Sequence, residues 1–502
     1  MNSNSIGIVD SVVETGGAFV NGQWMAGEGP DLQSISPTDD QVVWSGRTSS
    51  TRQVDQAFEA ARRAQPKWGS TTQESRIAIC RAYAAFVKEH AGELATLISQ
   101  ETGKTLWESR AESGTVAGKI ELSIDSIHSR RDTQSFEMSG GMNAVTRFKP
   151  HGVLGILGPF NFPAHLPNGH IVPAIMAGNT VVFKPSEMTP AVGAWMAAAW
   201  QSVGLPAGVL NLVQGTRDVG IALANHSQAD GLLFTGSSGA GRALHRAFAE
   251  HPQKILALEM GGNNPLVVHQ VADLNAAAYL TILSAYITAG QRCTCARRLI
   301  VVDDRNSQQF LDILVEMIGK VSVGYYSDTP EPFIGTVISR GAGTKILGDF
   351  ERLVARGGRA LVSMKSLRGN PALLSPGLVD VSSVDKLPDE EVFGPLLTVK
   401  RVATLDEAIA EANNTSYGLS AGLLSDDRAS YERFIQRIRA GIVNWNRQTT
   451  GASGKLPFGG CGMSGNHRPA GFYSADYCSF AVGSLEAERL TLPEKLETGI
   501  NL

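Results

Sequence analysis

The sequence predicts an α/β protein with two units, each built on a parallel β-sheet covered by helices. Between residues 150 and 258, short apolar runs recur about every 25 residues, which leaves room for one crossover helix between neighbouring strands. A second alternation of apolar runs and helical stretches begins near residue 265 and continues past residue 440. The chain has 502 residues, enough for about three folding units, and its 54 glycines indicate many tight turns.

Helices are expected first, between residues 50 and 130. Apolar residues follow the i, i+3, i+4, i+7 spacing of a buried helix face at Val54, Ala57, Phe58 and Ala61. Residues 71–74 have the form of a capping box, which would begin another helix.

The apolar runs predict the order of the strands. The first sheet is expected to contain residues 153–157, 180–183, 209–213, 231–234 and 255–258. The second unit is expected to begin with a strand at 265–268 and a helix near 273–287, and to continue with strands at 299–302, 396–402 and 441–444. Residues 131–149 and the last 25 or so fit neither sheet, so they are expected to be interface ribbons or surface additions.

Composition excludes several classes of protein. Lys and Arg total 44 against 48 Asp and Glu, a net charge of −4 that disfavours a nucleic-acid partner. The first basic residue is Arg47, so no secretory signal is expected, and the longest apolar span, residues 191–200, is too short to cross a membrane. Five cysteines argue against a disulfide framework. A cytoplasmic protein is therefore expected.

Two glycine-rich segments are candidates for phosphate binding. Residues 460–465 spell G-x-G-x-x-G, but no clear strand precedes them and Pro469 interrupts any following helix, so this segment is rejected. Residues 234–241 follow an apolar run and open onto a helix, whose free N–H groups could face a phosphate. A tight turn without a ligand is the alternative for this second segment.

Two further residues could carry chemistry. Cys293, in Gly-Gln-Arg-Cys, is a candidate nucleophile, although an isolated cysteine is more often inert. Glu259 ends a predicted strand and precedes Gly261 and Gly262, which would let the backbone approach a ligand. Parallel sheets place their chemistry at this edge, whereas an ordinary surface glutamate is the alternative.

These segments together resemble the aldehyde dehydrogenase family. The similar motifs, in the same order, are residues 158–163, 183–187, 234–241, 258–264, Gly290–Cys293, 391–395 and 457–460. The resemblance implies an NAD-binding domain with a parallel sheet (1–129 and 150–258) and a second α/β, catalytic domain (259–462). It also implies a small oligomerisation ribbon, with oligomerisation or bridging segments at 130–149 and 463–502, and hence a homo-oligomer, a dimer or a tetramer.

The resemblance also implies a role for each matching residue. Cys293 would attack the aldehyde, Asn161 would hold the oxyanion, and Glu259 would activate water to hydrolyse the thioester. The cofactor would be NAD, bound by Lys184, Glu187, Gly236, Ser237, Gly241, Glu391 and Phe393. Each cofactor residue has an ordinary structural alternative, such as an exposed ion pair for Lys184 with Glu187.

Segments near the nucleophile and the C-terminus resemble those of family members that oxidise the 5-semialdehyde of N-succinylglutamate in arginine breakdown. Cations that could bind such an acidic aldehyde are Arg292, Arg447, His467 and Arg468. Arg292, next to Cys293 in an extended segment, could instead point to the opposite face. Arg297 and Arg298 are expected at a helix end or on the surface. No metal is expected, since His165 and His170 are poorly spaced as ligands and lack a cysteine pair.

Three alternatives remain open from the sequence. One is a dehydrogenase for another acidic semialdehyde, such as succinate or glutamate semialdehyde. A CoA-acylating enzyme is disfavoured, because such family members generally lack a glutamate at the position of Glu259. The third is a catalytically silent homologue, against which Asn161, Glu259 and Cys293 together argue.

Overall fold

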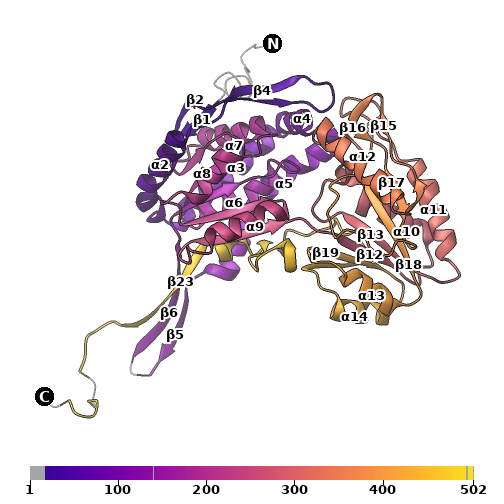
Figure 1. Cartoon of the computed structure of the whole chain (residues 1–502). Coiled ribbons are helices and arrows are strands. Elements are labelled where there is room, and N and C mark those ends of the chain that lie inside the picture. Colours follow the sequence, from indigo (N-terminus) through magenta and orange to yellow (C-terminus); the bar gives the residue numbers. More distant parts are fainter. Residues whose placement is uncertain (1–16, 140, 493–495, 501–502) are drawn as a thin grey trace.

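The computed structural model describes residues 17–139, 141–492 and 496–500. It has two lobes and a long ribbon that projects from the first lobe (Figure 1). The parts of the predicted NAD-binding and bridging segments at residues 1–16, 140, 493–495 and 501–502 lie outside the described residues. The predicted α/β fold is confirmed, with two separate seven-stranded sheets.

The first sheet has the strand order β11-β10-β7-β8-β9-β1-β2. Its parallel strands are β7 (Val153–Leu157), β8 (Thr180–Lys184), β9 (Leu210–Leu212), β10 (Gly231–Gly236) and β11 (Ile255–Met260). An antiparallel hairpin of β1 (Gly17–Val20) and β2 (Gln23–Ala26) extends the other edge. The parallel strands lie between helices on both faces, which explains their continuous apolar runs.

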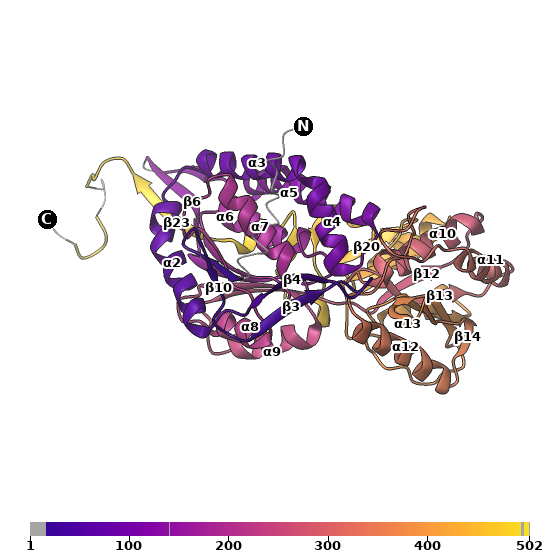
Figure 2. The ribbon, with the colours of Figure 1, turned by 90° about the horizontal axis from the view of Figure 1, so that it is seen from above.

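Two layers of helices enclose this sheet (Figure 2). One face packs against α2 (Thr51–Gly69), α8 (Arg217–Asn225) and α9 (Ser238–Phe248). The other face packs against α6 (His165–Met176) and α7 (Pro190–Ser202), which α3 (Gln73–Glu89), α4 (Ala91–Thr102) and α5 (Leu106–Arg131) cover in turn. In this core, the rings of Tyr83 and Trp200 stack with their centroids 3.9 Å apart.

The predicted capping box at residues 71–74 is wrong in its details. Thr72 caps α3, since its hydroxyl accepts a hydrogen bond from the Ser75 amide at 3.2 Å. The reciprocal pair that defines a capping box starts α2 instead, between Ser50 and Gln53. The sequence pattern therefore found the helix start but placed the cap one residue early.

The second lobe contains a sheet of order β14-β17-β18-β13-β12-β19-β20. Its strands are β12 (Asn264–Val268), β13 (Ala296–Val302), β14 (Arg359–Val362), β17 (Gly377–Asp380), β18 (Leu396–Val402), β19 (Ser420–Leu424) and β20 (Ile442–Trp445). Helices α10 (Leu274–Ala285), α11 (Ser307–Gly319) and α12 (Arg340–Ala355) cover one face, and α13 (Leu405–Asn413) and α14 (Arg428–Arg437) the other. Every strand predicted here is present.

The projecting ribbon is a three-stranded antiparallel sheet that joins distant parts of the chain. β6 (Met142–Pro150) pairs with both β5 (Gln134–Met138) and β23 (Ser479–Ala487). Minor hairpins are formed by β3 (Asp31–Ile35) with β4 (Val42–Arg47), β15 (Ser366–Leu367) with β16 (Asn370–Leu374), and β21 (Pro457–Phe458) with β22 (Ala470–Gly471). Among the described helices, none is long and apolar enough to span a bilayer.

The outer edge of the first sheet is covered by the C-terminal part of the chain. β11 is the edge strand, and Glu259 forms an isolated antiparallel bridge with Gly465. The Asn466 side chain accepts a hydrogen bond from the Leu258 amide at 2.9 Å and donates one to the Leu256 carbonyl at 2.8 Å. Asn466 thus satisfies backbone groups that an edge strand would leave unpaired.

Candidate active site

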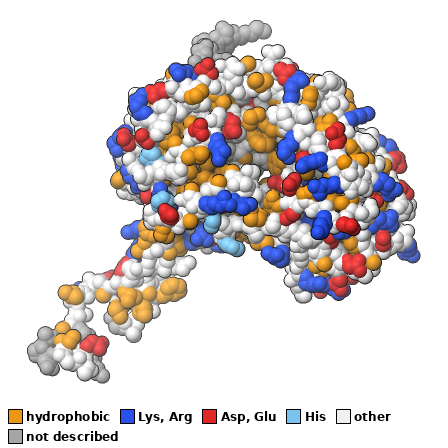
Figure 3. Space-filling view, viewed as in Figure 1, with side chains coloured by type: hydrophobic (Ala, Val, Ile, Leu, Met, Phe, Trp, Pro, Cys, Tyr) orange, Lys and Arg blue, Asp and Glu red, His pale blue; other side chains and the backbone are white. Residues whose placement is uncertain are grey.

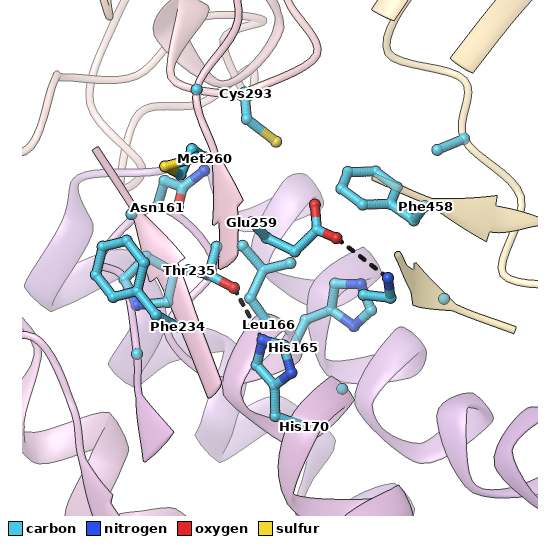
Figure 4. A pocket seen from close by; sticks show the side chains of 18 of the residues that line it. Asn161, His165, Leu166, His170, Phe234, Thr235, Glu259, Met260, Cys293 and Phe458 are labelled. Atoms are coloured by element: carbon cyan, nitrogen blue, oxygen red, sulfur yellow. Dashed lines mark hydrogen bonds between the residues drawn. The ribbon is translucent and has the colours of Figure 1, made fainter. Parts of the chain in front are cut away.

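A cavity of about 720 Å³ lies where the first lobe meets the second lobe and the C-terminal loops. Figure 3 shows the molecule hollowed between its two lobes, with apolar side chains inside the recess. The cavity is lined by Asn161, Glu259 and Cys293, three residues that the sequence places far apart. Figure 4 shows their side chains around one space, together with the ring of Phe458.

The turn before Cys293 is held in an unusual backbone conformation. Thr288, Ala289 and Gly290 have positive φ angles of 56°, 50° and 71°. Only glycine adopts this region at little cost, so the surrounding contacts must impose it on the other two. After this turn, the Asn264 side-chain amide donates hydrogen bonds to the carbonyls of Cys293 and Cys295, at 2.7 and 2.8 Å. Asn264 lies in β12, so this strand holds the segment that carries Cys293 in place.

The Cys293 thiol is protonated in this environment. Burial raises its pKa above the ordinary value, and the nearby Glu391 and Glu259 carboxyls raise it further, while Arg297 acts in the opposite direction. Within the described chain, no acceptor is found for the Cys293 backbone amide. The cysteine therefore needs a base before it can attack as a thiolate, and its own N–H remains available to a ligand.

Asn161 lies opposite, in the loop between β7 and α6. One N–H of its side-chain amide donates to the Gln291 carbonyl at 2.9 Å, two residues before Cys293. The amide has a second N–H, for which the described residues provide no acceptor. Its backbone carbonyl accepts a hydrogen bond from Lys104 Nζ at 2.7 Å, which fixes the loop from behind.

Helix α5 holds both the Asn161 loop and the Cys293 loop. The Glu112 carboxylate pairs with Lys104 at 2.6 Å and accepts from the Ala164 and His165 amides, both at 3.1 Å, so it caps the start of α6. One turn earlier on the same face, Glu108 pairs with Arg292 at 3.2 Å. Both carboxylates are buried, so the relative position of the two loops depends on this one helix.

Glu259 is the second-last residue of β11, and its carboxyl group lies in the same space. Its Oε1 accepts a hydrogen bond from the Ala470 amide at 3.1 Å, whereas its Oε2 is buried and has no partner in the described structure. Burial raises its pKa well above the ordinary value for a glutamate. A carboxyl group with a raised pKa and a free oxygen is suited to accept a proton near neutral pH.

The other end of the cavity has the features of a nucleotide site. Helix α9 starts there, with Ser237 as its N-cap and no acidic residue in its first turn, so its free N–H groups can face an anion. A Cβ added to Gly236 would lie 2.5 Å from the Phe234 ring, and one added to Gly241 would lie 2.2 Å from Met260 Sδ. Packing against these side chains therefore requires glycine at both positions.

Two carboxyl groups line this part of the cavity. Glu391 Oε1 is buried without a hydrogen-bond partner among the described residues, and it lies 3.7 Å from the Arg297 guanidinium group. Glu187 lines the cavity with 46% of its side chain exposed, and its carboxylate lies 3.7 Å from the buried Lys184 Nζ. Phe393 forms the wall beside Glu391, with its ring edge-on to Phe160.

The cations predicted to bind substrate are not brought into the cavity. Arg292 points to the opposite face, where Nε donates to Thr288 Oγ1 at 2.8 Å and the guanidinium pairs with Glu108. Arg447, His467 and Arg468 are exposed, and none of them is among the described residues that line the cavity. The prediction for these four residues is therefore not supported by the geometry.

Arg297 and Arg298 also differ from expectation. Both are buried rather than solvated, and their guanidinium groups donate to backbone carbonyls. Arg297 binds the carbonyls of Gly290 and Arg292 at 2.7 and 3.1 Å, so it braces the turn that carries Cys293. The expected surface location is wrong because these residues begin β13, a strand that is buried along its whole length.

The sequence did not reveal the polar residues that support the site. Glu108, Glu112 and Lys119 lie on one long helix, and a charged residue on a helix is usually exposed. His170 is buried and bonds to Tyr477 at 2.9 Å and Thr235 at 3.0 Å, which explains its presence without a metal. Within the described residues, no cluster could hold a metal ion. The sequence of α5 did carry one signal. Charged residues recur in it at i, i+4 spacing, and its apolar residues do not gather on a separate face.

Comparison with known proteins gives concordant results. The sequence model of the aldehyde dehydrogenase family matches residues 24–480. Over 484 residues, the chain is 52% identical to the N-succinylglutamate 5-semialdehyde dehydrogenase of Ectopseudomonas mendocina (strain ymp), covering 96% of this chain and 99% of the relative.

Solved structures share the whole fold. An aldehyde dehydrogenase from Brucella melitensis biovar abortus 2308 is 29% identical with a TM-score of 0.89, covering 96% of this chain and 99% of the other. A 1-pyrroline-5-carboxylate dehydrogenase from Thermus, solved with bound NAD, is 27% identical with a TM-score of 0.88, covering 97% of both chains.

Proposed function

The chain belongs to the aldehyde dehydrogenase family, and from that premise we propose that it oxidises N-succinyl-L-glutamate 5-semialdehyde to N-succinyl-L-glutamate with NAD, a reaction of arginine breakdown. The observation that carries this proposal is the convergence of Cys293, Asn161 and Glu259 on one cavity whose other end suits a dinucleotide. The relative at 52% identity supports the choice of substrate.

The residues at the far end of the cavity fit NAD. We assign the pyrophosphate to the start of α9 at Gly236, Ser237 and Gly241, where free backbone N–H groups are available. Lys184 and Glu187 would hold the adenosine ribose, and Glu391 with Phe393 the nicotinamide ribose. When bound, NAD supplies the acceptor for the hydride.

The first chemical step belongs to Cys293. Its deprotonated sulfur attacks the aldehyde carbon, and the carbonyl oxygen becomes an oxyanion in a tetrahedral thiohemiacetal. The second N–H of the Asn161 side chain and the Cys293 amide are the donors assigned to that oxyanion. Loss of a hydride from this carbon leaves a thioester on Cys293.

Asn161→Ala should lower kcat by about 10²- to 10³-fold, because one preorganised donor to the oxyanion is lost. Steady-state NADH production at saturating aldehyde and NAD measures this effect. Thermal unfolding of the same variant checks that the loop remains folded. A decrease of less than about fivefold in kcat would reject Asn161 as an oxyanion donor.

Hydrolysis of the thioester is assigned to Glu259. Its carboxylate takes a proton from a water molecule, which attacks the thioester carbon and releases the carboxylate product and the Cys293 thiol. Water as the acyl acceptor makes the enzyme hydrolytic rather than CoA-acylating. The Ala470 amide holds the other carboxyl oxygen and so orients the base.

A screen of purified enzyme against a panel of aldehydes with NAD tests the proposed reaction. We expect the highest kcat/KM for N-succinylglutamate semialdehyde, above those for succinate and glutamate semialdehydes. A higher value for one of these two would transfer the assignment to that acidic semialdehyde. Lack of NADH formation with every aldehyde would leave a catalytically silent homologue.

The position of Glu187 predicts a preference for NAD over NADP. A carboxylate at the ribose accepts hydrogen bonds from its hydroxyls but repels the 2′-phosphate of NADP. Glu187→Ser should therefore decrease the ratio of kcat/KM for NAD to that for NADP by about tenfold or more, since a charge repulsion of a few kcal/mol is removed. A wild-type enzyme that used NADP better would contradict the assignment.

We further propose that the two sheets correspond to an NAD-binding and a catalytic domain, and that the ribbon of β5, β6 and β23 joins subunits of a homo-oligomer. The ribbon exposes large apolar side chains at Phe136, Met138, Phe480 and Leu485. Exposed apolar surface of this kind is typical of contacts between proteins. A monomeric mass in light scattering would contradict the oligomer.

A further inference from the structure

Lys119 is the only lysine or arginine among the described residues that line the cavity. It projects from a face of α5 whose other cavity residues, Thr115, Gly118 and Leu122, follow helical spacing. Across from this face lie the loop at 452–454 and the short strand β22. We expect the part of an aldehyde beyond its reacting carbon to lie along this face of α5.

Among the described residues, the buried Lys119 ammonium has no counter-ion. Only 5% of the residue is exposed, and within this part of the chain Nζ donates a single hydrogen bond, to the Gly471 carbonyl at 3.0 Å. Lys104, at the other end of the same region, is instead paired with Glu112. A buried ammonium with one neutral partner is costly in folding, and it has two further N–H donors to offer.

Other titratable groups near Lys119 do not supply negative charge. His165 and His170 are neutral, because burial and the Lys119 charge lower both of their pKa values to about 3. Burial raises the pKa of Glu259, which favours the neutral form of its carboxyl group. Burial lowers the pKa of Lys119 itself to about 8, so it is still mostly charged at neutral pH.

Lys119 is also connected to the catalytic carboxyl group through β22. The Gly471 carbonyl accepts from Lys119, and the amide of the preceding residue, Ala470, donates to Glu259. The adjacent residues Gly471 and Ala470 therefore bind the Lys119 ammonium and the Glu259 carboxyl group, respectively. Cys293, Glu259 and Lys119 line the same cavity, so we expect the chain of a substrate attached to Cys293 to reach Lys119.

We propose that Lys119 binds a carboxylate of the aldehyde substrate and is the main residue that selects anionic over neutral aldehydes. In N-succinylglutamate semialdehyde, three carbons separate the aldehyde carbon from the α-carboxylate, which makes this carboxylate the candidate. The ammonium would donate its free N–H groups to it in a charge-assisted pair. This inference rests on the proposed function. It assigns to Lys119 the role that the sequence suggested for Arg292, which pairs with Glu108, and for the exposed Arg447, His467 and Arg468.

The test compares Lys119→Met with wild type on the semialdehyde and on its dimethyl ester, which has the same chain without the charges. The variant should lose about 10- to 100-fold in kcat/KM on the anionic substrate, mainly through a higher KM, and stay within about threefold on the ester. Lys119→Arg, which keeps the charge, should restore part of the preference. Arg110→Met is the matched control, since it removes an exposed cation from the same helix outside the cavity and should change neither rate.

Each outcome decides between distinct explanations. Equal losses on both substrates would indicate that Lys119 only anchors Gly471, and would overturn the proposal. If Lys119→Met does not fold, Lys119→Gln and Lys119→Arg provide the same comparison, and no difference between them in selectivity would also overturn it. If wild type shows no preference for the anionic aldehyde, or no activity at all, it is the proposed substrate or function that fails.

Discussion

Cys293→Ala should abolish aldehyde oxidation, with kcat lower by at least about 10⁴-fold, because the covalent route needs a thiolate and Cys293 is the only cysteine among the described residues that line the cavity. The side chain is small and alanine fits its place, so the protein should still fold and bind NAD. NADH formation measures turnover, and cofactor titration by fluorescence measures binding.

Cys295→Ala is the matched control for this experiment. Cys295 lies two residues away and is fully buried, with its Sγ near the Ile287 carbonyl rather than in the cavity. This variant should keep most of its turnover. Near-normal activity of Cys293→Ala, or complete loss in Cys295→Ala, would show that the nucleophile is misassigned.

Glu259→Gln should have the second largest effect, slowing turnover by about 10²- to 10⁴-fold through loss of a general base. The amide keeps the size of the carboxyl group and can still accept from the Ala470 amide, so the geometry is preserved. If the base acts on the thioester, the variant should accumulate acylated Cys293. Rapid mixing with aldehyde and NAD, acid quench and mass measurement would detect this species.

The pH profile provides an independent check of Glu259. Its pKa is raised by burial, and only the deprotonated carboxylate can act as a base. Turnover should therefore rise with pH through that raised pKa in wild type, and this rise should be absent in Glu259→Gln. Glu259→Asp retains a carboxylate on a side chain that is one methylene shorter. Its turnover should be slower but should show the same rise with pH. Normal turnover in Glu259→Gln would exclude the role.

The sequence did not predict β1, β2, β14, β17 and β19, but it predicted the other strands of both sheets, most of which are buried. Such strands are short apolar runs bounded by turns, a signal that depends on local sequence alone. Cys293, Glu259 and Asn161 could be found through their family motifs. These three residues lie in one cavity because of how the two lobes meet. A local sequence pattern does not contain that information.

The charged residues were harder to predict for a physical reason. Arg292 and Lys119 look alike in sequence, and what separates them is whether a carboxylate lies within reach. Glu108 forms an ion pair with Arg292, whereas Lys119 donates a hydrogen bond to the neutral Gly471 carbonyl. Both partners are distant along the chain, so the sequence could propose cations near the active site but could not decide which ones remain available.

The covering of β11 by Asn466 has a consequence for how the protein is made on the ribosome. All strands of the first sheet lie within residues 17–260, so this sheet can assemble before the second lobe exists. Asn466 is translated about 200 residues after β11 ends, which takes roughly 10 to 40 s at about 5–20 residues per second. Throughout that interval the nascent chain presents an uncovered sheet edge, the kind of surface through which growing chains on neighbouring ribosomes aggregate. Glu259, the assigned base, also lacks its Ala470 contact until then.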